Sequence, residues 1–170
     1  YRVIGDFVTE FQPKLVVALT ATCPPRVEAD IRHVMCIEEA IKVLHYPRRT
    51  NLDLKSQLWN GPASLLNLME RANGPAVIYC ATQKRTEELA LELQALSGQE
   101  VGFYHGGLTK TQRSHTQDRF MQGDIQWMCA TNAFGMGVDK SDIRLVVHRD
   151  HAGSMEAQSQ ELGRGGRDGK

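Results

Sequence analysis

The order of hydrophobic and polar positions along the chain predicts five short β-strands. Each is a run of four or five mostly apolar, partly β-branched residues, which is the length and composition of a buried strand. The five runs are Leu15–Leu19, Ala76–Cys80, Val101–Tyr104, Gln126–Ala130 and Arg144–His148. No apolar run approaches the roughly 18 residues that a membrane-spanning helix needs, so no membrane is expected as a partner.

Helical patterns lie between these runs, and most begin at a residue that favours a helix start. Proline at the first helical position and a hydroxyl side chain just before it both stabilise a helix N-terminus. Such residues are Pro25, Pro62, Thr82, Thr109 and Ser154. Thr109 also forms a capping-box sequence with Gln112. Gly98 and Gly123 suit the ends of two helices, because glycine readily adopts the left-handed conformation that ends a helix.

From residue 76 onward, predicted strands and helices alternate. This order predicts an α/β fold in which a parallel sheet carries helices on both faces, and residues 62–170 are expected to form that domain. Residues 37–61 show little periodicity and are expected to be a linker. Residues 1–36 are too few for a domain and are expected to be the C-terminal remnant of one that lies upstream. The first residue, Tyr1, is not a methionine, which favours a fragment.

Composition and charge narrow the class of protein. The 170 residues carry 20 Lys and Arg against 20 Asp and Glu, so the net charge is zero. This balance excludes a polybasic protein that binds nucleic acid through bulk charge, but not local phosphate sites at loops and helix ends. The cysteines form no C-x-x-C pair, so no metal site is expected. Cys80 and Cys129 lie in apolar runs, and buried free thiols favour an intracellular location, in cytoplasm or nucleus.

The segment that follows Ser159 contains two arginines three residues apart, Arg164 and Arg167, among glycines. With Gln160 four residues before the first, these side chains lie on one side of a helix. A guanidinium is planar, always charged and matches phosphate oxygens, so the pair could stabilise charge on a transferring γ-phosphoryl group. The alternative is a glycine-rich helix end whose arginines face water, and residue types alone favour it.

The predicted strand that ends near Thr131 is followed by Gly135, Gly137, Asp139 and Lys140. The Thr131 hydroxyl and the amides after it could hold a phosphate of a nucleic-acid strand. Asp139 could accept hydrogen bonds from ribose hydroxyls, as acids near nucleotides do. The alternative is a tight connection in which glycines satisfy turn geometry and Asp139 caps a helix. The two interpretations are about even.

Hydroxyl or glycine residues also follow three other predicted strands. They are Thr20 and Thr22, Thr82, and the His105–Gly107 loop. In α/β sheets, binding sites form at loops that leave the carboxyl ends of the strands. Taken singly, each of these loops is better explained as a turn that caps the next helix.

Taken together and in this order, five segments resemble the second half of a superfamily 2 helicase motor, and the RecQ family of DNA helicases above all. The segments Leu19–Thr22, Val77–Thr82, Tyr104–Leu108, Ala130–Lys140 and Gln160–Gly169 resemble motif III, motif IV, the segment after it, motif V and motif VI. The Phe-Gly-Met-Gly string within the fourth is characteristic of RecQ proteins. Five motifs at family-like spacing form a specific match that covers nearly the whole chain.

The resemblance implies two RecA-like domains that clamp ATP and Mg²⁺ between them and step 3′ to 5′ along single-stranded DNA. The second domain supplies the arginine finger and half of the DNA track. By motif position, Arg167 would be the finger, Arg164 a second γ-phosphate contact or a coupling residue, and Gln160 a nucleotide sensor. Gly137 and Asp139 would lie near the ribose. The DNA backbone would be contacted by Thr82, Arg85, Gly106, Thr131 and Lys140.

The phosphate-binding lysine loop and the Asp-Glu-x-His motif of such helicases do not occur in these 170 residues. ATP and Mg²⁺ would therefore be held mainly by an upstream domain, and the fragment alone is expected neither to hydrolyse ATP nor to unwind DNA. Two alternatives stay open: an RNA helicase of superfamily 2, and a catalytically inactive nucleic-acid-binding module. Gln160-Glu161 favours RecQ over DEAD-box proteins, which usually have His-Arg at the start of motif VI. The intact Arg164 and Arg167 argue against an inactive module.

Overall fold

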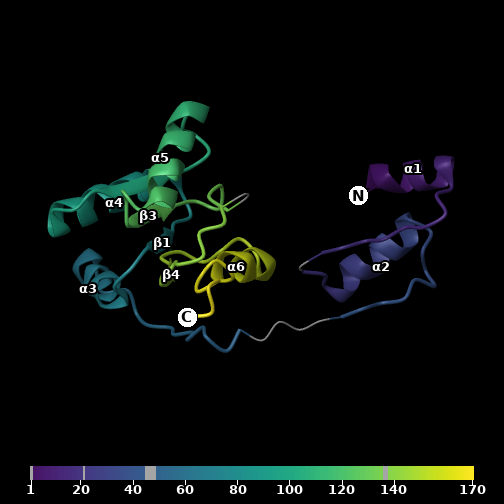
Figure 1. Cartoon of the computed structure of the whole chain (residues 1–170), viewed down its shortest axis with the longest axis horizontal. Coiled ribbons are helices and arrows are strands. Elements are labelled where there is room, and N and C mark those ends of the chain that lie inside the picture. Colours follow the sequence, from purple (N-terminus) through teal and green to yellow (C-terminus); the bar gives the residue numbers. More distant parts are fainter. Residues whose placement is uncertain (1, 21, 45–48, 136–137) are drawn as a thin grey trace. The chain divides into compact units, whose positions relative to one another are not determined.

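The computed structural model describes residues 2–20, 22–44, 49–135 and 138–170 (Figure 1). The chain divides into two compact units, Tyr1–Arg48 and Arg49–Lys170. Each unit is described by itself.

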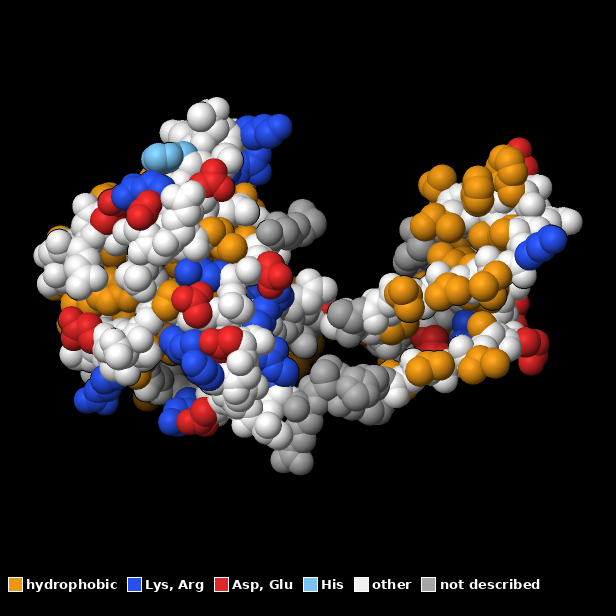
Figure 2. All heavy atoms as spheres, in the orientation of Figure 1, with side chains coloured by type: hydrophobic (Ala, Val, Ile, Leu, Met, Phe, Trp, Pro, Cys, Tyr) orange, Lys and Arg blue, Asp and Glu red, His pale blue; other side chains and the backbone are white. Residues whose placement is uncertain are grey.

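The first unit contains two helices, α1 (Arg2–Phe11) and α2 (Pro25–Val34). Pro25 occupies the first turn of α2, as its sequence predicts. The helices approach closely at Gly5, where a Cβ atom would lie 2.3 Å from the Val34 carbonyl oxygen. Many hydrophobic side chains of this unit nevertheless face solvent (Figure 2). They include Val3, Ile4, Phe7, Phe11, Leu15, Val17, Leu19, Ile41, Val43 and Leu44.

The strand predicted at Leu15–Leu19 is wrong, because these residues have no regular secondary structure. A strand needs a neighbour that accepts and donates its backbone hydrogen bonds. No described residue of this unit belongs to a strand, so that neighbour is missing here. Leu19 is accordingly 90% exposed.

The second unit is built on a four-stranded sheet. Its strands are β1 (Ala76–Tyr79), β2 (Val101–Tyr104), β3 (Trp127–Ala130) and β4 (Leu145–His148). The strand order is β2-β3-β1-β4, and all three neighbouring pairs are parallel. Ile78 lies at the centre, paired with Cys129 on one side and Val147 on the other. Four predicted strands and the parallel sheet are thereby confirmed.

Four helices connect and flank these strands. They are α3 (Pro62–Ala72), α4 (Gln83–Ser97), α5 (Lys110–Gln122) and α6 (Met155–Leu162). The predicted start signals are confirmed, since Thr82, Thr109 and Ser154 each accept a hydrogen bond from the backbone N–H three residues later. Gly98 and Gly123 end α4 and α5 at φ values of 69° and 88°, where a side chain would be strained.

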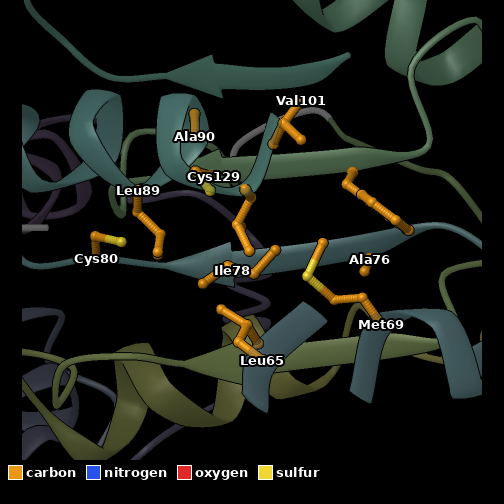
Figure 3. Packing of buried hydrophobic residues seen from close by; sticks show 11 residues of the cluster. Leu65, Met69, Ala76, Ile78, Cys80, Leu89, Ala90, Val101 and Cys129 are labelled. Atoms are coloured by element: carbon orange, nitrogen blue, oxygen red, sulfur yellow. The ribbon is translucent and has the colours of Figure 1, made fainter. Parts of the chain in front are cut away.

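Hydrophobic residues pack against both faces of the sheet, because alternate residues of a strand point to opposite sides. Ala76 and Ile78 of β1 face the cluster formed with α3 and α4 (Figure 3). Val77 and Tyr79 belong to the second cluster, which includes Phe120 of α5. Helices on both faces are therefore confirmed.

The burial predicted for two cysteines is also confirmed. The side chains of Cys80 and Cys129 are 5% and 0% exposed and both belong to the first cluster. Burial raises the pKa of the Cys80 thiol to about 11. Both thiols therefore stay protonated at neutral pH and act as small hydrophobic side chains.

Candidate functional site

The loops that leave the carboxyl ends of the strands meet along one edge of the sheet. The backbone N–H of Thr131, after β3, donates to the carbonyl of Tyr104, 3.0 Å away at the end of β2. Asp150, after β4, accepts a hydrogen bond of 3.0 Å from the N–H of Ala81, after β1. The parallel topology therefore brings together segments that are far apart in the sequence, as a site at this edge requires.

Arg167 and Asp139, predicted from separate segments, form an ion pair. Arg167 Nη1 lies 2.6 Å from Asp139 Oδ1, and its Nε donates to the Gly163 carbonyl at 3.3 Å. The Asp139 side chain is 82% exposed and that of Arg167 is 35% exposed. An ion pair this accessible to water is weak, so a phosphate could replace the carboxylate at the guanidinium.

Arg164 lies deeper than Arg167 and holds the loop after β3. Its Nη1 donates to the Val138 carbonyl at 3.0 Å. A Cβ atom on Gly135 would lie 2.9 Å from Nη2, so a larger residue there would displace the guanidinium. Its Nε is buried without a hydrogen-bond partner among the described residues. Arg164 therefore joins the end of α6 to the loop after β3, with one donor left unused.

A buried polar group formed by Tyr79, His148 and Glu161 was not predicted from the sequence. The Tyr79 hydroxyl donates to the Phe134 carbonyl at 3.0 Å, and the Tyr79 ring stacks on His148 with 5.5 Å between centroids. His148 Nε2 in turn lies 2.7 Å from Glu161 Oε2, and both side chains are largely buried. Burial raises the pKa of Tyr79 to about 12. The group ties β1, β4 and α6 to the loop after β3.

A sequence signal for this group existed in part. Glu161 stands three residues before Arg164 in the predicted last helix, so the sequence places both on one helix face; in the structure α6 ends at Leu162, and Glu161 is its buried residue. His148 ends a predicted strand next to apolar positions. The pairing itself depends on how α6 docks, which periodicity does not reveal.

The remaining nucleotide-site predictions have different outcomes. Gln160 lies on α6 with its side chain exposed, unlike its buried neighbour Glu161. Gly137 lies outside the described residues.

Three of the predicted DNA contacts lie at the ends of β1 and β2. Thr82 caps α4 by accepting from the N–H of Arg85 at 3.2 Å, and both residues are exposed. Gly106 is exposed, and a Cβ atom there would meet nothing within 4 Å. A Cβ atom on the neighbouring Gly107 would lie 2.3 Å from Gln83 Oε1, so the two loops touch.

Thr131 is largely buried. Its hydroxyl accepts a hydrogen bond from the N–H of Ala133 at 3.4 Å, and the residue is only 8% exposed. Thr131 therefore stabilises the turn after β3. A nucleic-acid phosphate could contact only the small part of the residue that is exposed.

Lys140 points into the fold. Its Nζ lies 3.1 Å from Asp142 Oδ1, 3.4 Å from the Met121 carbonyl and 5.6 Å from the centre of the Phe120 ring. The residue is 8% exposed. Contact with DNA stays a prediction, and it would have to replace these internal contacts.

The side chains at this edge suit an anion better than a metal ion. Arg167 offers an accessible planar fork, and Arg164 Nε is an unused donor nearby in sequence. Among the described residues, no group of three or more His, Cys, Asp or Glu side chains could hold a metal ion. No described helix is long and apolar enough to cross a membrane. The arrangement could bind a phosphate group.

Comparisons with known proteins identify a family and several similar proteins. Residues 61–169 match the family described as helicase conserved C-terminal domain. The chain is 36% identical to the probable ATP-dependent DNA helicase RecS of Bacillus subtilis, over 100% of this chain and 35% of the relative. It is 31% identical to ATP-dependent DNA helicase Q1 of Rattus norvegicus, over 99% of this chain and 28% of the relative. The chain thus spans about a third of the length of these relatives.

The fold also matches a solved structure. S. cerevisiae Dbp5 bound to RNA and ADP BeF3 has a TM-score of 0.70 at 24% identity. The match covers 96% of this chain and 45% of that chain. At this identity, the likeness shows the fold alone.

Proposed function

Because the chain belongs to the family of helicase conserved C-terminal domains and its sequence is of the RecQ type, we propose that it is the second RecA-like domain of a longer ATP-dependent DNA helicase. Residues 1–36 would be the end of the first RecA-like domain and residues 37–61 the linker. The exposed hydrophobic side chains of residues 1–48 support this assignment, because a surface so apolar is normally covered by more protein.

The observation that carries the proposal is the meeting of Arg167 with Asp139 at the carboxyl edge of the sheet. In the proposed cycle, ATP and Mg²⁺ bound mainly by the upstream domain present the γ-phosphate to this edge. Arg167 leaves Asp139 and stabilises the charge that develops as the phosphoryl group transfers. Asp139 would then be free to accept hydrogen bonds from the ribose, near which Gly137 is also predicted to lie. Gln160 would sense the nucleotide, and Arg164 would couple α6 to the loop after β3.

The same edge would supply half of a track for single-stranded DNA. Thr82 and Gly106 are exposed in loops and Arg85 is exposed in the first turn of α4, where a hydroxyl, a backbone amide and a guanidinium can each bind a phosphate. Thr131 and Lys140 would complete the track. Contacts of this kind need little net positive charge, in agreement with the neutral composition. The 3′ to 5′ direction rests on the RecQ resemblance.

Two observations favour DNA unwinding over the alternatives. The relatives that match the whole chain are named as DNA helicases, whereas the RNA-bound Dbp5 structure shares only the fold. Arg164 and Arg167 are both present, and a domain that had lost catalysis would not need Arg167 as an arginine finger.

The finger assignment is tested by Arg167→Ala in the longer protein that includes the upstream domain. We expect DNA-stimulated kcat for ATP to fall by about 10²- to 10⁵-fold, the range typical of lost transition-state charge stabilisation. Binding of single-stranded DNA should be nearly unchanged. Arg119→Ala is a matched control, because Arg119 forms an ion pair with Glu100 away from this edge. A variant with normal ATPase would falsify the finger assignment.

A further inference from the structure

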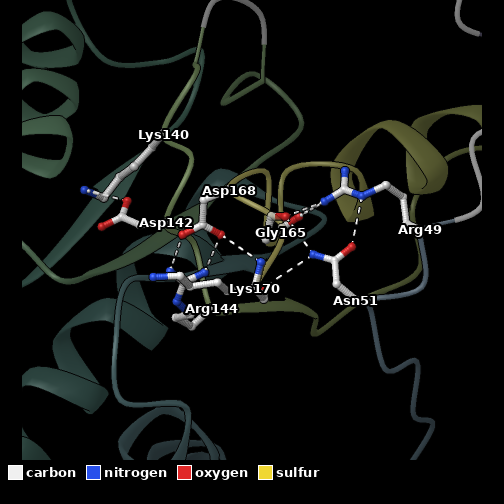
Figure 4. Close-up of polar contacts among 9 residues, drawn as sticks. Arg49, Asn51, Lys140, Asp142, Arg144, Gly165, Asp168 and Lys170 are labelled. Carbon is white, nitrogen blue, oxygen red and sulfur yellow. Dashed lines mark hydrogen bonds and ion pairs between the residues drawn. The ribbon is translucent and has the colours of Figure 1, made fainter.

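Two residues in the middle of the proposed linker, Arg49 and Asn51, are bound to the arginine loop, by which we mean residues 163–170 (Figure 4). Arg49 Nη2 donates to the carbonyls of Gly165 and Gly166, at 2.8 and 2.6 Å. Asn51 Nδ2 donates to the carbonyls of Gly166 and Lys170, at 2.8 and 3.2 Å. Four hydrogen bonds thus cross between segments that lie more than 110 residues apart in the sequence.

Two of these bonds meet at one atom, the carbonyl oxygen of Gly166. That carbonyl belongs to the peptide bond that leads into Arg167. A peptide unit is planar, so fixing its oxygen also fixes the N–H and the Cα position of the next residue. Arg49 and Asn51 therefore set where the Arg167 side chain begins.

The glycines of the loop make this approach possible. Gly165 and Gly166 are both buried, and Gly166 has a φ of +53°. A Cβ atom on Gly166 would lie 2.6 Å from Asn51 Nδ2, and one on Gly165 would touch Leu52 at 3.5 Å. A side chain at position 166 would therefore collide with Asn51, whereas one at position 165 would make an ordinary contact with Leu52.

The donors are themselves held in place. Arg49 Nε donates to Asn51 Oδ1 at 3.3 Å, which turns the amide so that its NH₂ group faces the loop. On the opposite side, the N–H of Gly166 donates to the Ile143 carbonyl at 2.8 Å. The loop is thus held from two directions, by residues 49–51 of the linker and by the segment before β4.

Asp168 strengthens the second of these attachments. Both of its carboxylate oxygens accept hydrogen bonds from the Arg144 guanidinium, and its N–H donates to the Ser141 carbonyl at 3.1 Å. The Arg144 guanidinium holds the pKa of Asp168 well below its usual value. Asp168 therefore stays ionised and bound to Arg144 at any pH used for an enzyme assay. The contacts of Arg49 and Asn51 are then the ones that a substitution can test.

We propose that Arg49 and Asn51 are positioning residues that hold the arginine loop, and with it Arg167, in the geometry needed for ATP hydrolysis. This role rests on the proposed function, since it assumes that Arg167 acts on the nucleotide. The same bonds connect the linker to the arginine loop. A movement of residues 49–51 would therefore move the Gly166 carbonyl as well.

Two variants separate the donor from simple packing. Asn51→Ala removes the amide, and Asn51→Asp keeps its size but turns an acceptor toward two carbonyls. Arg119→Ala again serves as the control that loses a paired arginine elsewhere. Hydrogen exchange of the Gly166 and Asp168 amides is measured by NMR in the 170-residue chain, together with the thermal midpoint. ATP turnover is measured in the longer protein, with Arg167→Ala alongside.

The expected result is faster exchange at both amides in the two Asn51 variants, with the amides of α4 unchanged. In the longer protein, kcat should fall by about 10- to 100-fold with KM for ATP nearly unchanged, the loss typical of a misplaced catalytic group. Unchanged exchange at Gly166 and Asp168 would show that Asn51 does not hold the arginine loop, whatever the value of kcat. Faster exchange with normal kcat, while Arg167→Ala is impaired, would overturn the positioning role.

The two proposals can fail separately. If Arg167→Ala turns over normally, the finger assignment is wrong, and the exchange measurement alone still decides whether Arg49 and Asn51 hold the loop.

Discussion

Removing the hydroxyl of Tyr79 tests the buried group that joins the sheet to the loop after β3. Tyr79 is 3% exposed, and its hydroxyl donates to the Phe134 carbonyl at 3.0 Å. Tyr79→Phe keeps the ring and its stacking on His148, and it removes only the hydroxyl, which donates to Phe134 and also interacts with Arg164. A buried hydrogen bond contributes about 1 kcal/mol net, and leaving its acceptor without a donor costs about 1–3 kcal/mol. We therefore expect the free energy of unfolding to fall by about 1–2 kcal/mol.

For a unit of this size, that loss corresponds to a fall in Tm of about 4–8 °C. Urea and thermal unfolding of the 170-residue chain, followed by circular dichroism, measure it, and the urea m-value should not change. Tyr104→Phe is the matched control, because the Tyr104 hydroxyl makes no hydrogen bond with the described residues, although its ring also contacts Phe134. If the two variants are equally stable, the Tyr79 hydroxyl does not contribute, and the group does not join β1 to the loop.

Two further predictions concern pH and DNA. Burial raises the pKa of Tyr79 to about 12, so its contribution to stability is complete below pH 10 and is lost as the pH rises through 12. The stability difference between wild type and Tyr79→Phe should therefore shrink between pH 10 and 12 in urea titrations, and a constant difference would contradict the assigned burial. Thr131→Ala should weaken binding of single-stranded DNA equally for all sequences, because a phosphate contact carries no base information. A fluorescence titration with oligonucleotides of different sequence measures this, and strong sequence dependence would rule out the phosphate role.

Local signals in the sequence were sufficient for most of the sheet domain. The capping box at Thr109 and the glycine at 123 mark both ends of α5, because these signals act within one turn of the helix. The alternation of β1 side chains between the two core clusters follows from strand geometry in the same way. The strand predicted at Leu15–Leu19 failed for the opposite reason, since a strand also depends on a partner that the local sequence does not contain.

The candidate site was predictable as a set of segments but not as a set of contacts. Arg167 and Asp139 stand 28 residues apart, and only the docking of α6 brings them within 2.6 Å. Lys140 carries the charge expected of a DNA contact, yet the fold directs it to Asp142. Arg49 and Asn51 lie in a stretch without periodicity, so nothing in their spacing indicated that they bind the arginine loop.

Duplex unwinding tests most directly whether this chain is the second motor domain of a DNA helicase. The longer protein that includes the upstream domain would be given ATP and a DNA duplex with a 3′ single-stranded tail, or an RNA duplex of the same sequence. We expect ATP-dependent separation of the DNA strands, little separation of the RNA strands, and loss of the activity in Arg167→Ala. Preferential unwinding of RNA, or DNA binding without ATP-dependent strand separation, would contradict it.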